Sequence, residues 1–356
     1  MLTSLVVEQF RGIDHIELRP KRITILSGRN NSGKTTILEA IFLHLGAASP
    51  ALSLLLNAMR GLPDKYTDPL YTWGWFFPNS NTTREPMIKS TDSDEVRRTV
   101  SLRVHAGQQV LIAPSTSPGD INGRSQGLLS TEPASGRELL LDYSDSSGKQ
   151  FVSVAKMTPK GVAMESPQPT VFAQSMIIFP LIPTSEDDAK RYSKLEEDNR
   201  HDEVLRVLQI IEPGLRRLAV SVSDNGTLIR CDLGLGRLIP LGMAGGGMCR
   251  LFDFVVSILS SPGGVVLIDE VDTGFHHSVM KDVWTAIVDV AARTNVQIIA
   301  TTHSSGCLRA AHAALSERLQ YEGVYYRIER DGTSTRAVEF DTETLGTAIE
   351  SDWEVR

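Results

Sequence analysis

The sequence predicts an α/β fold in which a mixed central sheet carries the motifs, together with an antiparallel β-subdomain and an insertion of helices and loops. Three observations support this prediction. An apolar strand pattern, Arg22–Ser27, leads through a glycine-rich segment into a helical pattern that begins at Thr36. A second apolar strand pattern, Gly264–Ile268, ends at two acidic residues. Between these motifs, strand-length segments alternate with spacers rich in Ser, Gly and Pro.

The N-terminal part is expected to hold a hairpin, a strand and two helices. Residues 5–18 alternate apolar and polar side chains around Arg11-Gly12, which predicts two short strands joined by a turn. The helix after the glycine-rich segment is expected to end near Gly46. A second apolar helix, Ala51–Met59, is predicted after a proline that breaks the first.

The glycine-rich segment has the form G-x-x-x-x-G-K-[ST], the phosphate-binding loop of nucleoside triphosphatases. Its glycines allow a tight turn in which successive N–H groups point at phosphate oxygens. Lys34 places a positive charge on the β- and γ-phosphates, and the Thr35 hydroxyl suits Mg²⁺. A chance match is the alternative, but the flanking strand and helix stand in the required order, and the helix N-terminus attracts anions. The expected nucleotide-binding residues are Gly28, Arg29, Asn30, Asn31, Ser32, Gly33, Lys34, Thr35 and Thr36.

The middle of the chain is expected to form antiparallel strands. An aromatic segment precedes them, Tyr71–Phe77, and we expect it to pack on the protein's own core, because aromatic side chains bury large areas. A partner-docking surface is the alternative. The strand candidates are Thr99–His105, Val110–Ala113, Glu138–Asp142, Gln150–Lys156 and Pro169–Ile178.

Two helices and two strands are predicted next. A charged helix is capped by Ser185 and runs to about Asn199, and its charge run is interpreted as a solvated face. A second helix covers Asp202–Ile211. The strands Arg217–Val222 and Leu228–Leu233 follow.

Acidic residues at the end of a buried strand form the second expected half of the site. Asp269 is placed to hold Mg²⁺ directly or through water, and Glu270 to orient and partly deprotonate the attacking water, a contribution of about 10²–10⁴-fold in rate. The neighbouring strand pattern, Val296–Thr302, ends at His303, which is expected to reach the γ-phosphate and the water. A hydrogen-bonded surface histidine is the alternative.

A second glycine loop precedes a long apolar helix, Met248–Leu259. Glycines directly before a helix form an anion site from N–H groups and the helix dipole. One nucleotide does not need two such loops from one subunit. We therefore expect Gly245, Gly246 and Gly247 to close over the nucleotide of a second subunit, with a flexible hinge loop as the alternative.

Composition narrows the class of protein. A chain of 356 residues can bury a substantial core as one large domain or two lobes, and its net charge of −7 argues against a global attraction to nucleic acid. Cys231, Cys249 and Cys307 are widely spaced and odd in number, which indicates thiols of a reducing compartment. The sequence has no signal-peptide pattern and no apolar run long enough for a bilayer, so we expect a cytoplasmic protein without membrane partners.

In these motifs the chain resembles the ABC-type ATPases of the RecF/SMC/OLD branch. It is most similar to the short AAA-like ATPases found beside, or fused to, nucleases in bacterial anti-phage systems. The segments that carry the likeness are Phe10-Arg11-Gly12, Gly28–Thr36, Leu241–Arg250, Leu267–His277 and Ala300–Ser304.

The resemblance implies an ABC-type P-loop ATPase head that uses ATP and Mg²⁺ and forms a homodimer, or a higher homo-oligomer, around two ATP molecules. In it, Asp272 belongs to the D-loop and assists nucleotide binding, and His276-His277 is interpreted as a cross-dimer contact rather than a metal site. Ala244 stands where transporters and SMC proteins have a serine, which leaves the hydrolysis rate open. Gln174 is the candidate for the Q-loop.

The expected division of the chain has three parts. Residues 1–60 form the N-terminal part of the ATPase lobe with the phosphate loop, and residues 61–200 the antiparallel β-subdomain with a variable insertion. Residues 201–356 form the C-terminal ATPase lobe with the signature, the acid motif, the D-loop and the H-loop.

The leading functional hypothesis is an ATPase that dimerises around ATP and regulates a separately encoded effector, a nuclease or toxin, in anti-phage defence. No long heptad segment and no nuclease constellation is visible in the sequence, so the effector is expected on another polypeptide. The alternatives are a RecF-like repair ATPase that clamps DNA directly and an ATP-dependent scaffold that hydrolyses slowly. A transporter subunit is disfavoured because its signature differs.

Overall fold

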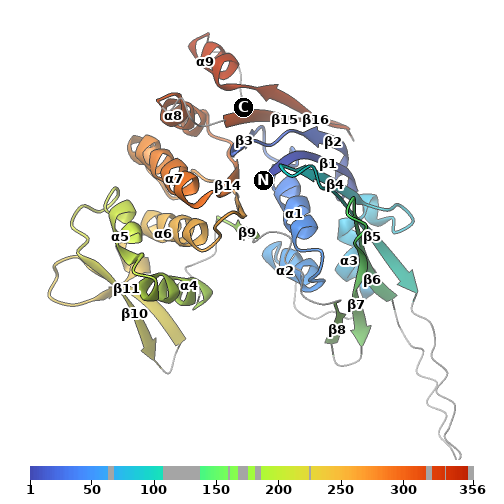
Figure 1. Ribbon diagram of the computed structural model, residues 1–356, viewed down its shortest axis with the longest axis horizontal. Helices are drawn as coiled ribbons and strands as arrows, with labels where there is room; N and C mark the ends of the chain where they lie inside the picture. Colours follow the sequence, from blue (N-terminus) through green and yellow to red (C-terminus); the bar gives the residue numbers. More distant parts are fainter. Residues whose placement is uncertain are drawn as a thin grey trace, which may run out of the picture.

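The computed structural model describes residues 1–62, 68–106, 137–158, 161–166, 175–180, 186–223, 226–317, 323–332 and 334–351. A central sheet runs through the molecule, with a limb of antiparallel strands on one side and a limb of helices on the other (Figure 1). The predicted α/β class, with one mixed and one antiparallel sheet, is confirmed.

The central sheet has six strands in the order β16-β15-β3-β14-β13-β9. Neighbouring strands from β15 to β9 are parallel, and the edge strand β16 is antiparallel to β15. The predicted adjacency of the acid-bearing and histidine-bearing strands is thereby confirmed. The strands are β3 (Ile23–Ser27), β9 (Ser175–Ile178), β13 (Val265–Ile268), β14 (Gln297–Thr301), β15 (Gly323–Asp331) and β16 (Ser334–Phe340).

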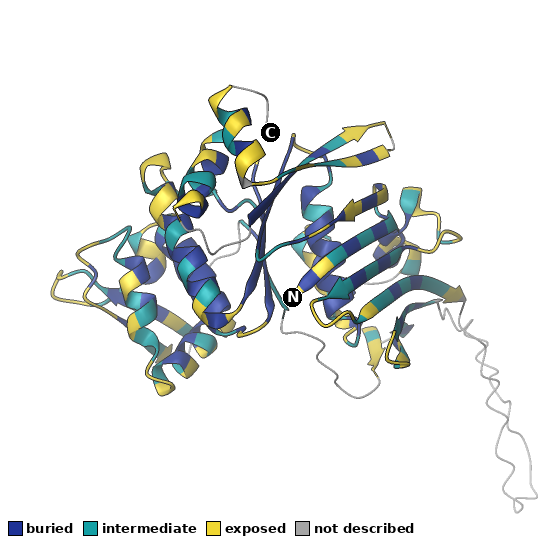
Figure 2. Ribbon diagram, turned by 45° about the horizontal axis from the view of Figure 1, so that its top comes forward, coloured by how far each residue is buried: buried dark blue, intermediate teal, exposed yellow. Residues whose placement is uncertain are grey.

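The inner strands of this sheet are buried along their whole length, which is typical of parallel strands covered on both faces. In β13, Val265 and Leu267 pack into the core that faces the antiparallel sheet. Val266 and Ile268 pack into the opposite core, beneath the C-terminal helices. The buried strands at the centre of Figure 2 therefore separate two hydrophobic cores, and their carboxyl ends are fixed at one edge.

A seven-stranded antiparallel sheet forms the second layer, in the order β2-β1-β4-β5-β6-β7-β8. The predicted N-terminal hairpin is confirmed, and it belongs to this sheet. Two members, β4 and β8, were not predicted, and the candidate Val110–Ala113 lies outside the described residues. The strands are β1 (Leu2–Phe10), β2 (Ile13–Leu18), β4 (Met87–Asp92), β5 (Arg97–Ala106), β6 (Arg137–Asp145), β7 (Gln150–Thr158) and β8 (Gly161–Glu165).

The prediction that Pro169–Ile178 is an antiparallel strand is wrong for the part that the structure describes. Ser175–Ile178 forms β9, which pairs in parallel with β13 at the edge of the central sheet. A short apolar run does not reveal its pairing direction, because that direction depends on a partner far away in the sequence. The Q-loop candidate Gln174 lies outside the described residues.

Helices cover both faces of the central sheet. The first, α1, lies between the two sheets and is buried almost all round, as its apolar sequence requires. With it are α2 and α3, whereas the remaining helices and a small sheet form the other limb (Figure 1). The helices are α1 (Lys34–Leu45), α2 (Ala51–Met59), α3 (Pro69–Trp73), α4 (Glu186–Glu197), α5 (His201–Leu208), α6 (Gly246–Leu259), α7 (Met280–Thr294), α8 (Ser305–Ser316) and α9 (Thr342–Glu350).

The small sheet consists of β10 (Arg217–Ser223), β11 (Gly226–Asp232) and β12 (Ile239–Pro240). Short 3₁₀ turns cover Gly74–Phe76, Pro78–Ser80, Leu241–Ala244 and His277–Val279. The expected segment 61–200 does not coincide with one sheet, because β1 and β2 join β4 to β8 while β9 joins the central sheet.

The second predicted helix of the charged region ends earlier than expected. It was predicted to reach Ile211, but α5 ends at Leu208. The next N–H groups close tight turns, from Ile210 to the carbonyl of Val207 and from Ile211 to that of Leu208. The following Pro213 disfavours a helical conformation for the residue before it, so the helix stops short. The predicted cap Ser185 lies outside the described residues.

The aromatic segment packs on the protein's own core, as predicted. Trp73, Phe76 and Phe77 are buried. The Arg11 guanidinium lies 4.7 Å from the centroid of the Phe76 ring, and the Arg11 N–H donates to the Phe76 carbonyl at 2.9 Å. This segment therefore supports the turn of the N-terminal hairpin, while Tyr71 and Trp75 remain exposed.

Candidate nucleotide site

The glycine-rich segment forms a tight loop between β3 and α1. Gly28 has φ 134° and Gly33 has φ 103°, values in the left-handed region that side chains disfavour. A Cβ atom at Gly28 would overlap the carbonyl oxygen of Ile328 on β15. Gly33 directly precedes α1, so the first N–H groups of this helix lie at the loop. The backbone thus has the form that a phosphate group requires.

Lys34 lies inside this loop. Its Nζ donates to the carbonyl oxygens of Gly28 at 2.7 Å and Arg29 at 2.8 Å. Burial lowers the pKa of Lys34, and the nearby carboxylates of Asp269 and Glu270 oppose that shift. The cation is therefore held at the loop, where an anionic ligand would replace its carbonyl partners.

Thr35 joins the loop to the acid-bearing strand. Its hydroxyl lies 3.0 Å from both carboxylate oxygens of Asp269. Thr301, at the end of β14, donates its hydroxyl to the same carboxylate at 2.6 Å. One carboxylate and one hydroxyl form the donor set that Mg²⁺ takes from a protein when phosphate and water supply its other ligands. Thr35 and Asp269 therefore fit a magnesium ion.

Glu270 adopts a left-handed backbone conformation, with φ 46°. Such a conformation is uncommon for a residue with a long side chain and persists only where neighbours hold it. The Glu270 N–H donates to the Thr301 hydroxyl at 2.8 Å, and its Oε2 accepts from the Thr273 hydroxyl at 3.1 Å. The carboxylate is thus fixed beside Asp269.

Arg250 holds the same chain segment from the opposite side. This residue of α6 is 4% exposed. Its Nη2 donates to the carbonyl oxygens of Asp269 at 3.0 Å and Glu270 at 3.2 Å, and its Nη1 donates to that of Phe179 at 2.7 Å. Burial lowers the pKa of Arg250. Its positioning role was not predicted, although an arginine in a predominantly apolar helix was the available signal.

A cavity of about 360 Å³ lies between the loop and the acids. Its lining includes most of the predicted residues, among them the exposed His303. Sequence reasoning missed five others: Gly12, Ile13, Arg60, Thr301 and Arg330. The predicted residues that line it are Asn30, Asn31, Ser32, Gly33, Lys34, Thr35, Thr36, Asp269, Glu270 and His303.

Comparisons with known proteins agree with this geometry. Residues 23–309, more than half of the chain, match the family described as "AAA domain, putative AbiEii toxin, Type IV TA system". The chain belongs to this family. By class it is an ABC-type ATPase of the RecF/SMC branch, and its fold is that of a P-loop ATPase head.

Individual relatives differ in how much of this ATPase head they match. An "ATP/GTP phosphatase" of Helicobacter pylori (strain ATCC 700392 / 26695) is 21% identical over 346 residues, 89% of each chain. A "DNA replication and repair protein RecF" of Nitrosococcus oceani is 44% identical over 63 residues, so this match spans 17% of each chain. The Smc head domain of Pyrococcus furiosus, solved with the C-terminal domain of ScpA, has a TM-score of 0.50 at 11% identity over 99% of both chains, which shows the fold alone.

Three charged residues connect the cavity of the ATPase head to its N-terminal hairpin. Glu39 of α1 is fully buried and pairs with Arg60 at 2.7 Å and with Arg11 at 3.0 Å. Arg60 lines the cavity, and Arg11 packs on the aromatic segment. A buried carboxylate requires such partners. The Arg60 guanidinium at the cavity is therefore positioned by Glu39 of α1.

The second glycine loop lies outside this cavity. Gly245 has φ 116°, and a Cβ at Gly246 would meet no atom within 4 Å. A Cβ at Gly247 would lie 2.8 Å from the carbonyl oxygen of Gly274, so the loop packs against the predicted D-loop. Asp272 also lies outside the cavity lining, and its carboxylate accepts from the Thr302 hydroxyl at 2.6 Å.

The rings of the paired D-loop histidines lie against each other in a tilted arrangement. The ring centroids of His276 and His277 are 4.0 Å apart, and Nδ1 of His276 lies 2.9 Å from the Ser278 hydroxyl. Across the described part of the chain, no group of three His, Cys, Asp or Glu side chains is arranged to hold a metal ion.

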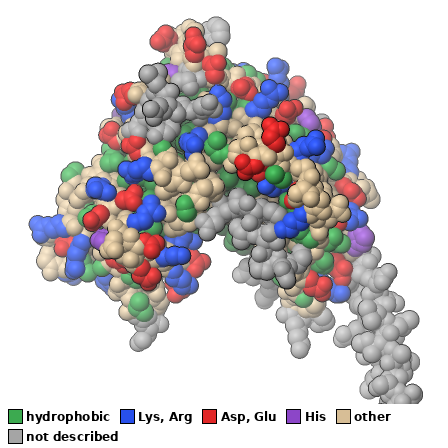
Figure 3. Space-filling model, viewed as in Figure 1, with side chains coloured by type: hydrophobic (Ala, Val, Ile, Leu, Met, Phe, Trp, Pro, Cys, Tyr) green, Lys and Arg blue, Asp and Glu red, His purple; other side chains and the backbone are tan. Residues whose placement is uncertain are grey.

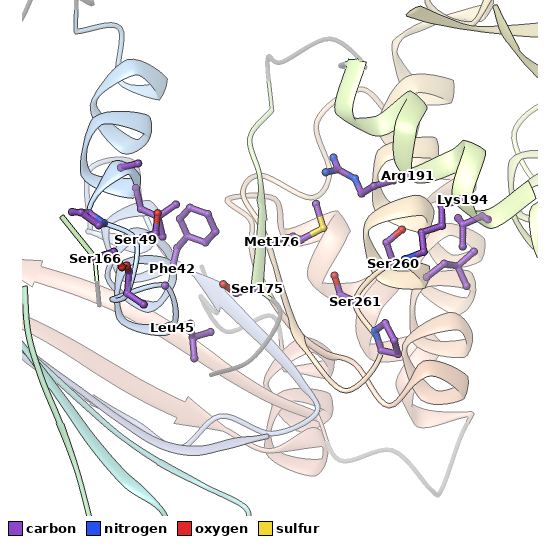
Figure 4. A pocket seen from close by; sticks show the side chains of 18 of the residues that line it. Phe42, Leu45, Ser49, Ser166, Ser175, Met176, Arg191, Lys194, Ser260 and Ser261 are labelled. Carbon is purple, nitrogen blue, oxygen red and sulfur yellow. The ribbon is translucent and has the colours of Figure 1, made fainter. Parts of the chain in front are cut away.

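A larger cavity of about 940 Å³ lies elsewhere, between the two limbs. Figure 4 shows Phe42 and Leu45 on one side, Arg191 and Lys194 on the other, and Met176 on the strand between them. None of the motif residues lines it. No described helix has the length and apolar character needed to cross a bilayer.

Proposed function

We propose that the protein binds ATP with Mg²⁺ and hydrolyses it to ADP and phosphate. The hydrogen bonds from the Thr35 hydroxyl to the Asp269 carboxylate are the observation that carries this proposal. They bring oxygen ligands of the phosphate loop and of the acid-bearing strand together. A bound magnesium ion there would neutralise charge that develops on the phosphate oxygens. The similarity to an "ATP/GTP phosphatase" over most of the chain supports the same reaction.

The side chains of this site divide the reaction between them. Lys34 binds the β- and γ-phosphates. Glu270 accepts a proton from the water as the water oxygen bonds to the γ-phosphorus and the bond to the bridging oxygen breaks. His303 lines the same cavity, and its ring N–H donates to a γ-phosphate oxygen beside the attacking water.

Removal of the Lys34 charge tests the nucleotide site directly. Lys34→Ala is expected to weaken ATP binding by about 100-fold or more, since a hydrogen bond to a charged group contributes up to about 3 kcal/mol. Lys281→Ala is the matched control, because Lys281 is an exposed cation paired with Glu317. Calorimetric titration with ATP and Mg²⁺ measures both variants. Unchanged ATP affinity in Lys34→Ala would refute the assignment of the phosphate loop.

We further propose that two copies close around ATP, each presenting Gly245–Gly247 to the nucleotide of the other. The open surroundings of Gly246 and the helix N-terminus that follows support this arrangement. Asp272 and the His276-His277 pair are placed at the same contact between subunits. The hydrolysis rate is an open quantity, because Ala244 takes the position of a serine in the related signatures.

The biological role that we propose is control of a separately encoded effector, a nuclease or toxin, in cytoplasmic anti-phage defence. The family description, which names a toxin–antitoxin system, supports this setting. Co-purification of the neighbouring gene products with the ATPase, with and without ATP, tests it. If none of the neighbouring gene products co-purifies with the ATPase, either with ATP or without it, the proposed role is contradicted.

Direct clamping of DNA, as in a RecF-like protein, is the second candidate, and the short RecF similarity favours it. On the face shown in Figure 3, Lys and Arg side chains are interspersed with Asp and Glu on both limbs. Strong, salt-dependent binding of duplex DNA by the purified protein would favour this candidate. Tight ATP binding with turnover near background would favour a slow ATP-dependent scaffold.

A further inference from the structure

The nucleotide cavity adjoins a second cavity of about 610 Å³ at the end of β15. The two cavities share Asn30, Asn31 and Ser32 of the phosphate loop, and Arg330 of β15. The second cavity is further lined by Arg29, by Arg327, Ile328, Glu329 and Asp331 of β15, and by Gly332 of the following turn. A ligand whose phosphates lie in the first cavity can therefore extend into the second without leaving the protein surface.

Contacts around the phosphate loop orient this pair of cavities. Thr35 faces Asp269, so the metal and the γ-phosphate belong to that side. On the other side, the Ile13 side chain lies 3.7 Å from the position of a Cβ at Gly33. The rest of a nucleotide must run away from the acids, toward the N-terminal hairpin and the end of β15.

Arg330 is fixed where the two cavities meet. Its Nε donates to the carbonyl oxygen of Gly332 at 3.2 Å. Its guanidinium lies over Gly12, with Nη1 3.3 Å from the position that a Cβ would take there. Two residues earlier, the Ile328 carbonyl lies against Gly28, and β15 pairs with β3, the strand that leads into the loop. The guanidinium plane is thus held beside the path of the nucleotide.

None of the described residues that line the two cavities is Phe, Tyr or Trp. A nucleobase in the second cavity meets no ring of Phe, Tyr, Trp or His among the described lining residues, whereas a guanidinium is planar and stacks on π-systems. The acidic Glu329 is engaged by Arg327 at 2.6 Å. The guanidinium groups of Arg29, Arg327 and Arg330 line the second cavity, and of these three Arg330 also lines the nucleotide cavity, so it is a planar group at the junction of the two.

We propose that the second cavity holds the nucleoside and that Arg330 stacks on its base. This inference rests on the proposed function, because it assumes that the phosphate loop holds a nucleoside triphosphate. Stacking contacts the face of a base rather than its hydrogen-bonding edge. The site accordingly accepts adenine and guanine with similar affinity, and Arg330 determines affinity for the nucleoside rather than for the phosphates.

Calorimetric titration of the full chain with ATP, GTP and inorganic tripolyphosphate, each with Mg²⁺, tests this inference. Arg330→Ala is expected to weaken ATP and GTP binding by about 5- to 30-fold and to leave tripolyphosphate binding unchanged. Arg336→Ala removes the same charge from the adjacent, exposed strand position outside both cavities and is expected to change none of the three. Equal losses for ATP and tripolyphosphate in Arg330→Ala would show a phosphate contact and overturn the inference.

Two further variants separate stacking from charge. Arg330→Tyr keeps a planar surface without a charge and is expected to retain most of the ATP affinity, whereas Arg330→Lys keeps the charge and is expected to lose it. The reverse order would overturn the inference. If the wild-type protein binds tripolyphosphate as tightly as ATP, the nucleoside site is wrong while the phosphate site stands. If it binds neither, with Lys34→Ala indistinguishable, the proposed function itself fails.

Discussion

The phosphate loop and the second glycine loop both place glycines directly before a long helix, but their surroundings differ. In the phosphate loop, Gly28 packs against Ile328, and Lys34 Nζ donates hydrogen bonds to the loop carbonyl oxygens. At the second loop, Cβ atoms added at Gly245 and Gly246 would meet nothing within 4 Å. The first loop needs glycine at Gly28 because of a contact within the subunit, and at Gly33 because of its positive φ. At Gly246 no such contact exists among the described residues.

This difference shows how one sequence pattern can serve two kinds of site. A loop that packs within its own subunit, as the phosphate loop does, offers a ligand a site formed by that subunit. In the proposed dimer, a loop that faces outward at a helix N-terminus contributes part of a site that the other subunit completes. Arg250 links the two regions. It lies in α6, the helix that follows the second glycine loop, and donates hydrogen bonds to the backbone carbonyl oxygens of Asp269 and Glu270.

Glu270→Gln gives the largest expected effect on the packed side. The amide cannot accept the proton of the attacking water, so hydrolysis is expected to fall by about 10²–10⁴-fold. ATP binding with Mg²⁺ is expected to persist, because Thr35 and Asp269 remain, and an ATP-bound dimer should accumulate. Phosphate release and light scattering measure the two effects. Turnover at the wild-type rate would show that Glu270 is not the base.

Gly28→Ala and Gly246→Ala sharpen the comparison through stability. Gly28→Ala is expected to destabilise the fold by about 2 kcal/mol, because φ 134° and the Ile328 carbonyl both oppose a side chain. Gly246→Ala is expected to be neutral, or stabilising by up to about 1 kcal/mol, because its site is open and helical. Urea unfolding of both variants measures the difference. Equal destabilisation would remove the distinction between the loops.

The helix behind the phosphate loop also responds to acid. Burial lowers the pKa of His44 on α1 to about 3, and its ring bonds to Ser90 at 2.7 Å. The folded-state pKa of His44 lies below the unfolded value of about 6.5. The contribution of the neutral His44 ring to the free energy of unfolding is therefore fully present above pH 6.5 and is lost as the pH falls toward 3.

His44→Gln removes this titration. The free energy of unfolding of the wild type is expected to fall with a slope of up to about 1.4 kcal/mol per pH unit relative to that of His44→Gln, between pH 6 and pH 4. Urea unfolding of both proteins at several pH values gives the slope. Parallel curves for the two proteins would mean that His44 does not titrate with folding.

Sequence reasoning worked where residues of one motif are close in the chain. The strand, loop and helix around Lys34 follow from local spacing, and so does the placement of Asp269 and Glu270 at a strand end. Their approach to Thr35 follows from the general rule that the carboxyl ends of parallel strands share an edge. These features needed no knowledge of long-range packing.

The missed residues come from segments whose position only tertiary packing decides. Arg330 reaches the cavity because β15 pairs with β3, its distant neighbour in the chain. The Asp331-Gly332 turn between two alternating segments was a hairpin signal, but it does not reveal which strand lies beside it. Arg60 likewise depends on its buried partner Glu39, which no local pattern distinguishes from a solvent-exposed helix residue.

Complementation between two inactive variants tests the composite site most directly. Gly246→Trp adds a large side chain at the second glycine loop and leaves the phosphate loop intact. A Cβ at Gly246 meets no atom of the described subunit within 4 Å. The variant is expected to bind ATP almost normally but neither to dimerise on ATP nor to hydrolyse it. Lys34→Ala keeps the outward loop but lacks the phosphate-binding charge. A heterodimer of the two has one site with an intact loop from each chain.

The measurement is phosphate release by the two variants alone and mixed in equal amounts, with ATP-dependent dimerisation followed by light scattering. The account predicts almost no activity for either variant alone and partial recovery in the mixture, accompanied by dimer formation. A Gly246→Trp protein that dimerises on ATP and turns over at the wild-type rate would contradict it.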